Sequence, residues 1–315
     1  MKARAPFAAA AALSLLGAAC GGSDGGGAAL GRGPATTTTS STVLVGQGAV
    51  VTRSGVVVPV ISRAGNGWVV STPCGRPAEI TDGTPTPAAA VVLDPGHGGK
   101  DPGAVSPSGL QEEPVNLAVA RYAKGALEAA GVSALLTRTG DYDMDLQPRA
   151  DIARAVRAQA FVSIHHNADP DGPSLRPGTE TYYQIGSTRS KRLSGLIYEE
   201  VVAALSRYPV AWVGDRDAGA KYRQGARGDY YAVLRLPGQI VSALAELAFI
   251  TNPPEAELVA RADVQQVEGE AVARGVLRYL RTEDPGSGFT EPYPRPSPPD
   301  RPPGSPPPPC TDPPL

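Results

Sequence analysis

The chain has 315 residues, a formal net charge of −2 and 41% hydrophobic residues. A nearly balanced charge offers no basic surface for nucleic acid, so we expect no nucleic-acid partner. The length permits one large or two modest domains. Glycine is dense near one end, with 8 of 37 in residues 17–33, and proline near the other, with 14 of 33 in residues 285–314, which indicates that not all of the chain folds into a core. We expect this folded part to be a monomer.

Residues 1–20 have the order of an export signal. Basic residues precede a short apolar stretch, and small residues then lead to Cys20. The apolar stretch is too short to span a bilayer as a helix, so the arrangement predicts a secretory signal. It also resembles a bacterial lipoprotein signal with Cys20 as the lipidated residue, although Gly17 stands where leucine is usual. We expect export, either to the cell envelope with a lipid anchor at the outer face of the membrane or as a secreted protein.

Two low-complexity segments flank the predicted folded part. Residues 21–42, rich in Gly, Ser and Thr, predict a flexible tether. Residues 284–315 are dominated by proline and predict an extended or disordered tail. If Cys20 is lipidated, Cys74 and Cys310 remain in an oxidising compartment. We expect these two to form a disulfide that pins the tail to the N-terminal part of the fold.

Residues 43–87 predict a small accessory β element, because short Val-rich runs up to residue 73 alternate with turn residues. Residues 88–283 predict a single α/β catalytic domain. Its expected strands are residues 90–94, 132–137, 160–164, 178–184 and 240–247, and its expected helices are residues 114–130, 147–158, 188–207 (capped by Ser187), 253–261 and 264–281. This alternation predicts an open, twisted, mostly parallel sheet with helices on both faces. Ligands then bind beyond the carboxyl ends of the strands.

All three histidines lie at or just after the ends of predicted strands: His97 in a Pro-Gly-His-Gly-Gly turn, and His165 and His166 together. Histidine is the commonest metal ligand, and two imidazoles with one carboxylate make a catalytic zinc arrangement. Either Glu112 or Glu113 can supply the carboxylate, while the other favours the helix N-terminus electrostatically. Because His165 and His166 are adjacent in a strand, they point to opposite faces. Only one of them is therefore expected to face His97.

A further carboxylate, Glu246, lies inside the apolar stretch of residues 242–250. A buried carboxylate is costly unless it is paired or lies near a metal. Glu246 is therefore either part of the same site or a salt-bridged structural residue.

Five motifs in order resemble the zinc-dependent N-acetylmuramoyl-L-alanine amidases of the Amidase_3 type over about residues 89–282. They are Leu93-Asp94-Pro95-Gly96-His97-Gly98-Gly99, Glu112 with Val115-Asn116-Leu117, Leu136-Thr137-Arg138, Ser163-Ile164-His165-His166-Asn167-Ala168 and Glu246-Leu247-Ala248-Phe249-Ile250-Thr251-Asn252. The resemblance implies that His97, Glu112 and His165 bind Zn²⁺ and that Glu246 is the catalytic base. It also implies cleavage of the amide between N-acetylmuramic acid and L-alanine, in peptidoglycan or in muropeptides. The chain departs from the family pattern at Glu113-Pro114 and at His166.

Four more residues are candidates for supporting roles. Asp94 or Asn167 would orient a zinc ligand, although Asp94 also suits a turn. His166 is assigned to packing, ligand support or substrate contact. Arg227 is either a substrate contact or a solvated side chain of a mobile loop at residues 214–228 that borders the cleft.

Regulated members of the family carry an extra helix that blocks the site, and no such helix is evident here, so we expect activity without an activator. Two other functions fit the sequence less well. One is a peptidoglycan-binding protein without activity, and the other is a zinc hydrolase of a different exported peptide amide.

Overall fold

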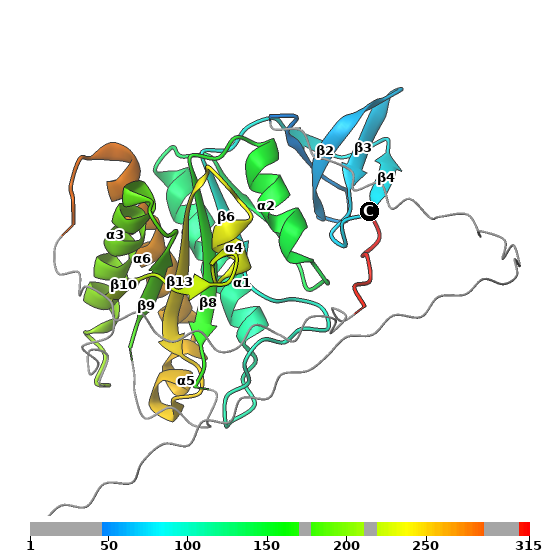
Figure 1. Ribbon diagram of the computed structural model, residues 1–315. Helices are drawn as coiled ribbons and strands as arrows, with labels where there is room; N and C mark the ends of the chain where they lie inside the picture. Colours follow the sequence, from blue (N-terminus) through cyan, green and yellow to red (C-terminus); the bar gives the residue numbers. More distant parts are fainter. Residues whose placement is uncertain (1–45, 170–177, 211–218, 287–308) are drawn as a thin grey trace, which may run out of the picture. The chain divides into compact units, whose positions relative to one another are not determined.

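The computed structural model describes residues 46–169, 178–210, 219–286 and 309–315 (Figure 1). The predicted signal at residues 1–20 and the predicted tether at residues 21–42 lie outside these ranges. Within them, no helix combines the length and the apolar character that crossing a membrane requires.

A six-stranded sheet forms the centre of the fold, with the strand order β10–β9–β13–β8–β6–β7. All neighbouring strands are parallel except β9 and β13, so the expectation of an open, mostly parallel sheet is confirmed. The strands are β6 (Val91–Pro95), β7 (Ala134–Leu136), β8 (Ala160–Asn167), β9 (Glu180–Tyr183), β10 (Gly219–Lys221) and β13 (Val241–Phe249). Strands β8 and β13 run beyond the predicted ends at residues 164 and 247, because pairing between them continues past the apolar run.

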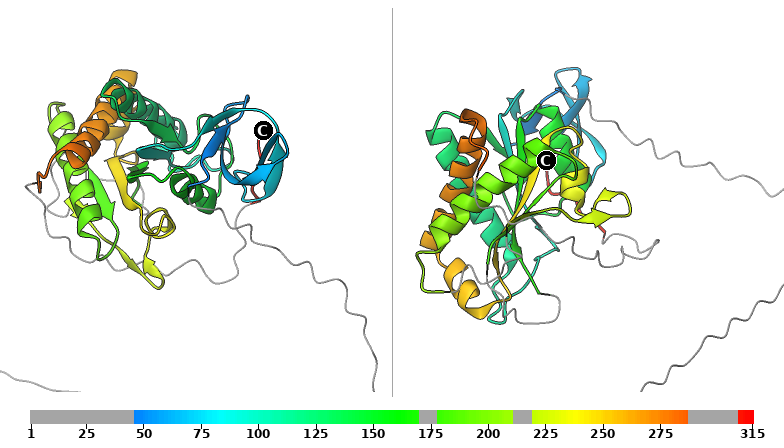
Figure 2. Two further views of the ribbon diagram at one scale, coloured as in Figure 1. Left: turned by 90° about the horizontal axis from the view of Figure 1, so that it is seen from above. Right: turned by 60° about the vertical axis from the view of Figure 1, so that its left-hand side comes forward.

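Helices cover both faces of this sheet, as the sequence predicts (Figures 1 and 2). Alternate strand residues divide between the two faces, with Leu93 packing on one side and Val92 on the other. The first face is covered by α1 (Glu112–Ala129), α3 (Thr188–Leu205), α5 (Pro253–Val259) and α6 (Ala262–Arg281), and the second by α2 (Leu146–Ala155) and α4 (Ala232–Arg235). The predicted cap of α3 is present, since the Ser187 side chain accepts a hydrogen bond from the backbone N–H of Ser190.

The accessory element is a five-stranded antiparallel sheet with the order β4–β3–β2–β1–β5. Its strands are β1 (Ala49–Val51), β2 (Val57–Ala64), β3 (Gly67–Ser71), β4 (Pro77–Ile80) and β5 (Thr84–Thr86). It has a small valine core of its own. Ala49 and Val57 also pack with Val92 and Phe161 of the main sheet, so this element lies against the same face as α2.

The mobile loop predicted at residues 214–228 differs from what the structure shows. Residues 214–218 lie outside the described ranges, but residues 219–229 form β10 and a hairpin of β11 (Gln224–Gly225) and β12 (Gly228–Asp229). The sequence missed β10 because three residues are too few to show a period. Between β9 and β13, α3 and the four-residue α4 are the only helices in the described residues.

The expected disulfide joins Cys74 and Cys310, whose Cα atoms are 5.6 Å apart. Residues 309–315 have no helix or strand, as expected of a proline-rich segment. The prediction of an extended or disordered tail stays a prediction, because residues 287–308 lie outside the described ranges. The disulfide and hydrogen bonds with Lys100 and Asp143 hold this segment to the folded part.

Candidate active site

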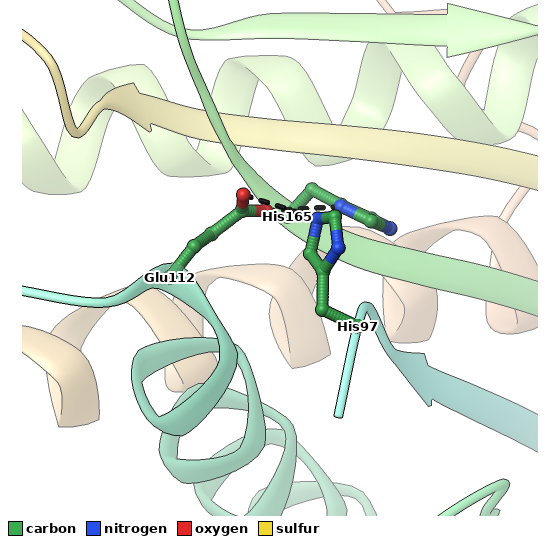
Figure 3. A group of neighbouring side chains, drawn as sticks. All are labelled: His97, Glu112 and His165. Atoms are coloured by element: carbon green, nitrogen blue, oxygen red, sulfur yellow. Dashed lines mark hydrogen bonds and ion pairs between the residues drawn. The ribbon is translucent and has the colours of Figure 1, made fainter. Parts of the chain in front are cut away.

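Three side chains from separate elements meet at the carboxyl edge of the main sheet (Figure 3). They are His97 from the turn after β6, Glu112 at the start of α1 and His165 from β8. One carboxylate oxygen of Glu112, Oε2, lies 3.1 Å from His97 Nε2, and the other, Oε1, lies 3.0 Å from His165 Nδ1. The candidate ligand atoms all lie within 4.8 Å of one another. Such separations suit ligands that bond zinc at about 2.0–2.2 Å.

The turn at residues 96–99 brings the two imidazoles close together. His97 itself has a φ of 64°, a left-handed conformation that is uncommon outside glycine and is often found at functional sites. At Gly96, an added Cβ would lie only 2.1 Å from His165 Cε1. Glycine is therefore required there, and its absent side chain lets the two rings approach to a centroid distance of 4.8 Å.

The charges at this cluster favour a cation. Burial works to raise the pKa of Glu112, but the imidazoles of His165 and His97 lower that pKa well below its usual value. Burial also opposes a charged His97, yet Asp101 and Glu112 raise the pKa of His97 to about 10. The carboxylates of Asp101 and Glu112 thus favour the protonated, positively charged form of His97. A divalent metal can replace the extra proton on this imidazole, because metal binding and proton release are linked. The donor set and its charge therefore fit zinc.

Asp101 is a residue that the sequence analysis missed. Its Oδ2 lies 2.8 Å from Nδ1 of His97, on the side of the ring away from Glu112. A carboxylate on the second nitrogen of a ligating histidine fixes the orientation of the ring and raises its basicity. The four-residue spacing from His97 was the only signal in the sequence, and many surface aspartates share it.

Asp94 is fully buried and does not touch the three clustered side chains directly. It accepts hydrogen bonds from Thr137 Oγ1 (2.6 Å), Ser163 Oγ (2.7 Å) and the Arg149 guanidinium (2.9 Å). Arg149 in turn donates to the backbone carbonyl of His97 at 2.8 Å. Asp94 therefore supports the His97 turn through Arg149 and is not itself a turn residue, because it lies within β6.

His166 points to the opposite face from His165, as predicted. It is buried, and its Nδ1 lies 2.8 Å from Asn116 Oδ1 while its Nε2 lies 3.4 Å from Glu268. Asn116 donates to Glu112 Oε1 at 3.0 Å, and the backbone N–H of His166 donates to the same oxygen. His166 thus supports the Glu112 carboxylate directly through its backbone N–H and indirectly through Asn116, and its imidazole is not a member of the cluster.

Glu246 lies beside His165 on the same face of the sheet, since the two residues are in register on the parallel strands β13 and β8. On its other side it is in register with Glu180 of β9. Burial and the charges of Glu112 and Glu180 raise the pKa of Glu246 well above its usual value. Among the described residues, its buried Oε2 has no hydrogen-bond partner. A buried carboxylate oxygen without a partner is rare and calls for an explanation.

Glu180, which is in register with Glu246 on the neighbouring strand, is a glutamate whose carboxylate is fully engaged in hydrogen bonds. Its carboxylate accepts hydrogen bonds from Lys221 Nζ (2.7 Å), Tyr182 Oη (2.8 Å) and Asn167 Nδ2 (2.8 Å). The predicted site residue Asn167 therefore contacts Glu180 and not a candidate zinc ligand. Glu180 and Lys221 were both missed, because the two residues that pair are 41 positions apart in the sequence.

Two other candidates lie away from the cluster. Glu113 pairs with the buried guanidinium of Arg138 at 2.5 Å, so Glu112 alone of the two glutamates reaches the histidines. Arg227 is exposed in the turn of the β11–β12 hairpin. It has no part in the cluster.

The fold and the site together define the class of protein. It is an α/β protein with a candidate metal centre, the cluster of His97, Glu112 and His165, at the carboxyl ends of its strands. A family model described as N-acetylmuramoyl-L-alanine amidase, Amidase_3, matches residues 91–278. The chain belongs to this family, and the resemblance indicated by its motifs is confirmed.

Individual relatives agree with this assignment. YqiI of Bacillus subtilis is 34% identical over 209 residues, which cover 66% of this chain and 90% of YqiI. The N-acetylmuramoyl-L-alanine amidase AmiC of Neisseria meningitidis is 32% identical and matches 61% of this chain and 53% of its own length. The solved structure of the amidase AmiC2 of Nostoc punctiforme superposes with a TM-score of 0.52 at 34% identity, over 61% of this chain and 96% of that chain.

Proposed function

We propose that this protein hydrolyses the amide bond between N-acetylmuramic acid and the L-alanine of peptidoglycan stem peptides. In this proposal His97, Glu112 and His165 hold zinc, and Glu246 is the general base. The observation that carries it is the buried Oε2 of Glu246, which has no partner among the described residues although it lies in register with His165. A carboxylate that accepts and returns a proton needs such a free oxygen.

When bound, zinc lowers the pKa of water to about 7 and polarises the scissile carbonyl. Glu246 takes the proton of the attacking water and delivers it to the amide nitrogen. The products are the carboxylate of the muramic acid lactyl group and the free amine of L-alanine, so one water is consumed for each bond. Burial and the nearby carboxylates raise the pKa of Glu246, which makes its carboxylate a stronger base than that of an exposed glutamate.

The decisive experiment measures release of free stem peptide from purified muropeptides by mass spectrometry, together with the zinc content of the protein. Glu246→Gln should keep zinc and lose about 10²–10⁴-fold in turnover. His97→Ala should lose both zinc and activity. Near-full activity of Glu246→Gln would show that the base is another group.

The same assay separates the two alternative functions. A binding protein without activity would retain muropeptides and release nothing. A zinc hydrolase of another amide would cleave within the peptide and leave the bond to the sugar intact. Either result with zinc-loaded protein contradicts the proposal.

We also propose that the enzyme acts outside the cytoplasm, attached through a lipid on Cys20. The disulfide between Cys74 and Cys310 supports an oxidising compartment. Mass spectrometry of the mature N-terminus tests the anchor, and Cys20→Ala should move the protein from the membrane fraction to the soluble fraction. An unmodified N-terminus would leave simple secretion as the route.

A further inference from the structure

The C-terminal segment 309–315 begins at a pocket beside two of the candidate zinc ligands, His97 and His165, whereas Glu112 and Glu246 are not among the residues that line this pocket. The pocket has a volume of about 490 Å³ and is lined by His97 and His165 and also by Pro309 and Cys310. This volume falls within the range of about 300–1,000 Å³ that is usual for small-molecule sites. The family model ends at residue 278, so part of the cleft comes from a segment that the family match does not include.

Polar contacts fix this segment against the loops that surround the cleft. Lys100 Nζ donates hydrogen bonds to the carbonyl of Pro309 (3.1 Å) and to Thr311 Oγ1 (2.7 Å). The backbone N–H of Thr311 donates to Asp143 Oδ2 at 2.9 Å. Lys100 and Asp143 themselves line the pocket, so the segment packs directly on its wall.

The accessory sheet supplies the covalent attachment. Cys74 lies in the turn between β3 and β4 and bonds Cys310. Asp312 accepts hydrogen bonds from the backbone N–H of Cys74 (2.8 Å) and pairs with Arg76 (2.7 Å). Because Arg76 is well exposed, this ion pair contributes little by itself. The disulfide is the covalent restraint on the segment, in addition to its hydrogen bonds with Lys100 and Asp143. Figure 1 draws the segment in red, ending beside the accessory sheet.

We propose that the disulfide-held segment 309–315 is a fixed wall of the substrate cleft that selects small peptidoglycan fragments over the polymer. This inference rests on the proposed function. Whichever part of the substrate enters the pocket beside His97, sugar or stem peptide, meets Pro309 and Cys310. That part must therefore be short. A continuing glycan strand or a cross-linked stem would need the space that the segment occupies.

The test compares two substrates: a soluble disaccharide–peptide fragment and intact polymeric sacculi. The double variant Cys74→Ser/Cys310→Ser removes the disulfide that holds the segment and leaves neither of its two cysteines as a free thiol. We expect the ratio of polymer to fragment cleavage to rise by at least about fivefold, mainly through a lower KM for the polymer. Ser54→Ala is the matched control, because it removes the hydrogen bond from Ser54 Oγ to the Pro314 carbonyl (2.7 Å) and keeps the disulfide. Its ratio should equal that of the unaltered protein.

A second variant that ends at Gly286 removes the segment completely and covers the case in which the double variant does not fold. Zinc content and circular dichroism establish that the variants compared are folded. An unchanged ratio in the folded variants would overturn the proposal. Failure of the unaltered, zinc-loaded protein to cleave either substrate would instead overturn the proposed function, so the two failures are distinguishable.

Discussion

Replacing Gly96 by alanine should push His165 out of the candidate zinc site. A Cβ at this position would lie 2.1 Å from Cε1, 2.2 Å from Nε2 and 2.5 Å from Nδ1 of the His165 ring. Carbon atoms in contact are normally about 3.5–4.0 Å apart, so the ring must move by roughly 1.4 Å. Gly96 is not among the glycines with a positive φ, so alanine brings no backbone penalty there. Displacement of the ring is then the main effect.

The size of this displacement sets the expected loss of metal affinity. Distances to a metal are tolerated only within about 0.2 Å of their ideal values, so a shift of roughly 1.4 Å removes His165 as a ligand. Changes that only disturb the support of a ligand typically cost about 10–100-fold in affinity. Loss of a ligand should cost at least about 100-fold, or about 2.8 kcal/mol. Competition titration against a chromophoric zinc chelator measures this directly.

Gly125→Ala is the matched control, because it makes the same one-methyl change in α1 where no atom lies within 4 Å of the added Cβ. It should leave zinc affinity unchanged and stabilise the helix by about 0.5–1 kcal/mol. If Gly96→Ala bound zinc as tightly as Gly125→Ala, the assignment of His165 as a ligand would be refuted.

Three further outcomes are expected. Burial works to raise the pKa of Asp94, but Arg149 and two hydroxyl donors lower this pKa below its usual value. The ionised Asp94 therefore stabilises the folded state fully above the unfolded pKa of about 3.9. This contribution to the free energy of unfolding is lost as the pH falls through the lower pKa of the folded state. Asp94→Asn should cost about 3–5 kcal/mol in urea unfolding at pH 7 because Arg149 is left unpaired, and a penalty that stayed constant down to pH 2 would contradict this. Asn116→Leu removes the donor to Glu112 and should weaken zinc binding by about 10–100-fold in the same titration; unchanged affinity would show that this support is dispensable. Dialysis against a chelator should abolish release of stem peptide and added zinc should restore it, whereas activity that survives metal removal would contradict a zinc enzyme.

The sequence alone determined most of the main sheet, although not its short edge strand β10, and its family motifs pointed to the clustered residues. Because one side of each strand or helix is buried, apolar residues recur along it with the period of that element. The alternation of strands and helices between residues 90 and 281 could therefore be predicted from the sequence. The residues alone left Glu112 and Glu113, and His165 and His166, as alternatives. The family resemblance implied His97, Glu112 and His165, and the structure brings these three side chains together. The opposite orientation of His165 and His166 followed from the two-residue period of a strand.

Only the tertiary structure decided which side chains support these residues. The contacts of Asp101 with His97, Arg149 with the His97 carbonyl and Lys221 with Glu180 carry no local pattern. They depend on distances between loops and strands that no period in the chain encodes. The same holds for the C-terminal segment: its sequence predicted an extended or disordered tail with a disulfide to Cys74, but only the structure shows that Pro309 and Cys310 line the pocket beside His97 and His165. A local sequence pattern predicts the secondary structure and burial of each residue. Which residues from distant segments become neighbours, including the partner of a disulfide, is decided only when the whole chain has folded.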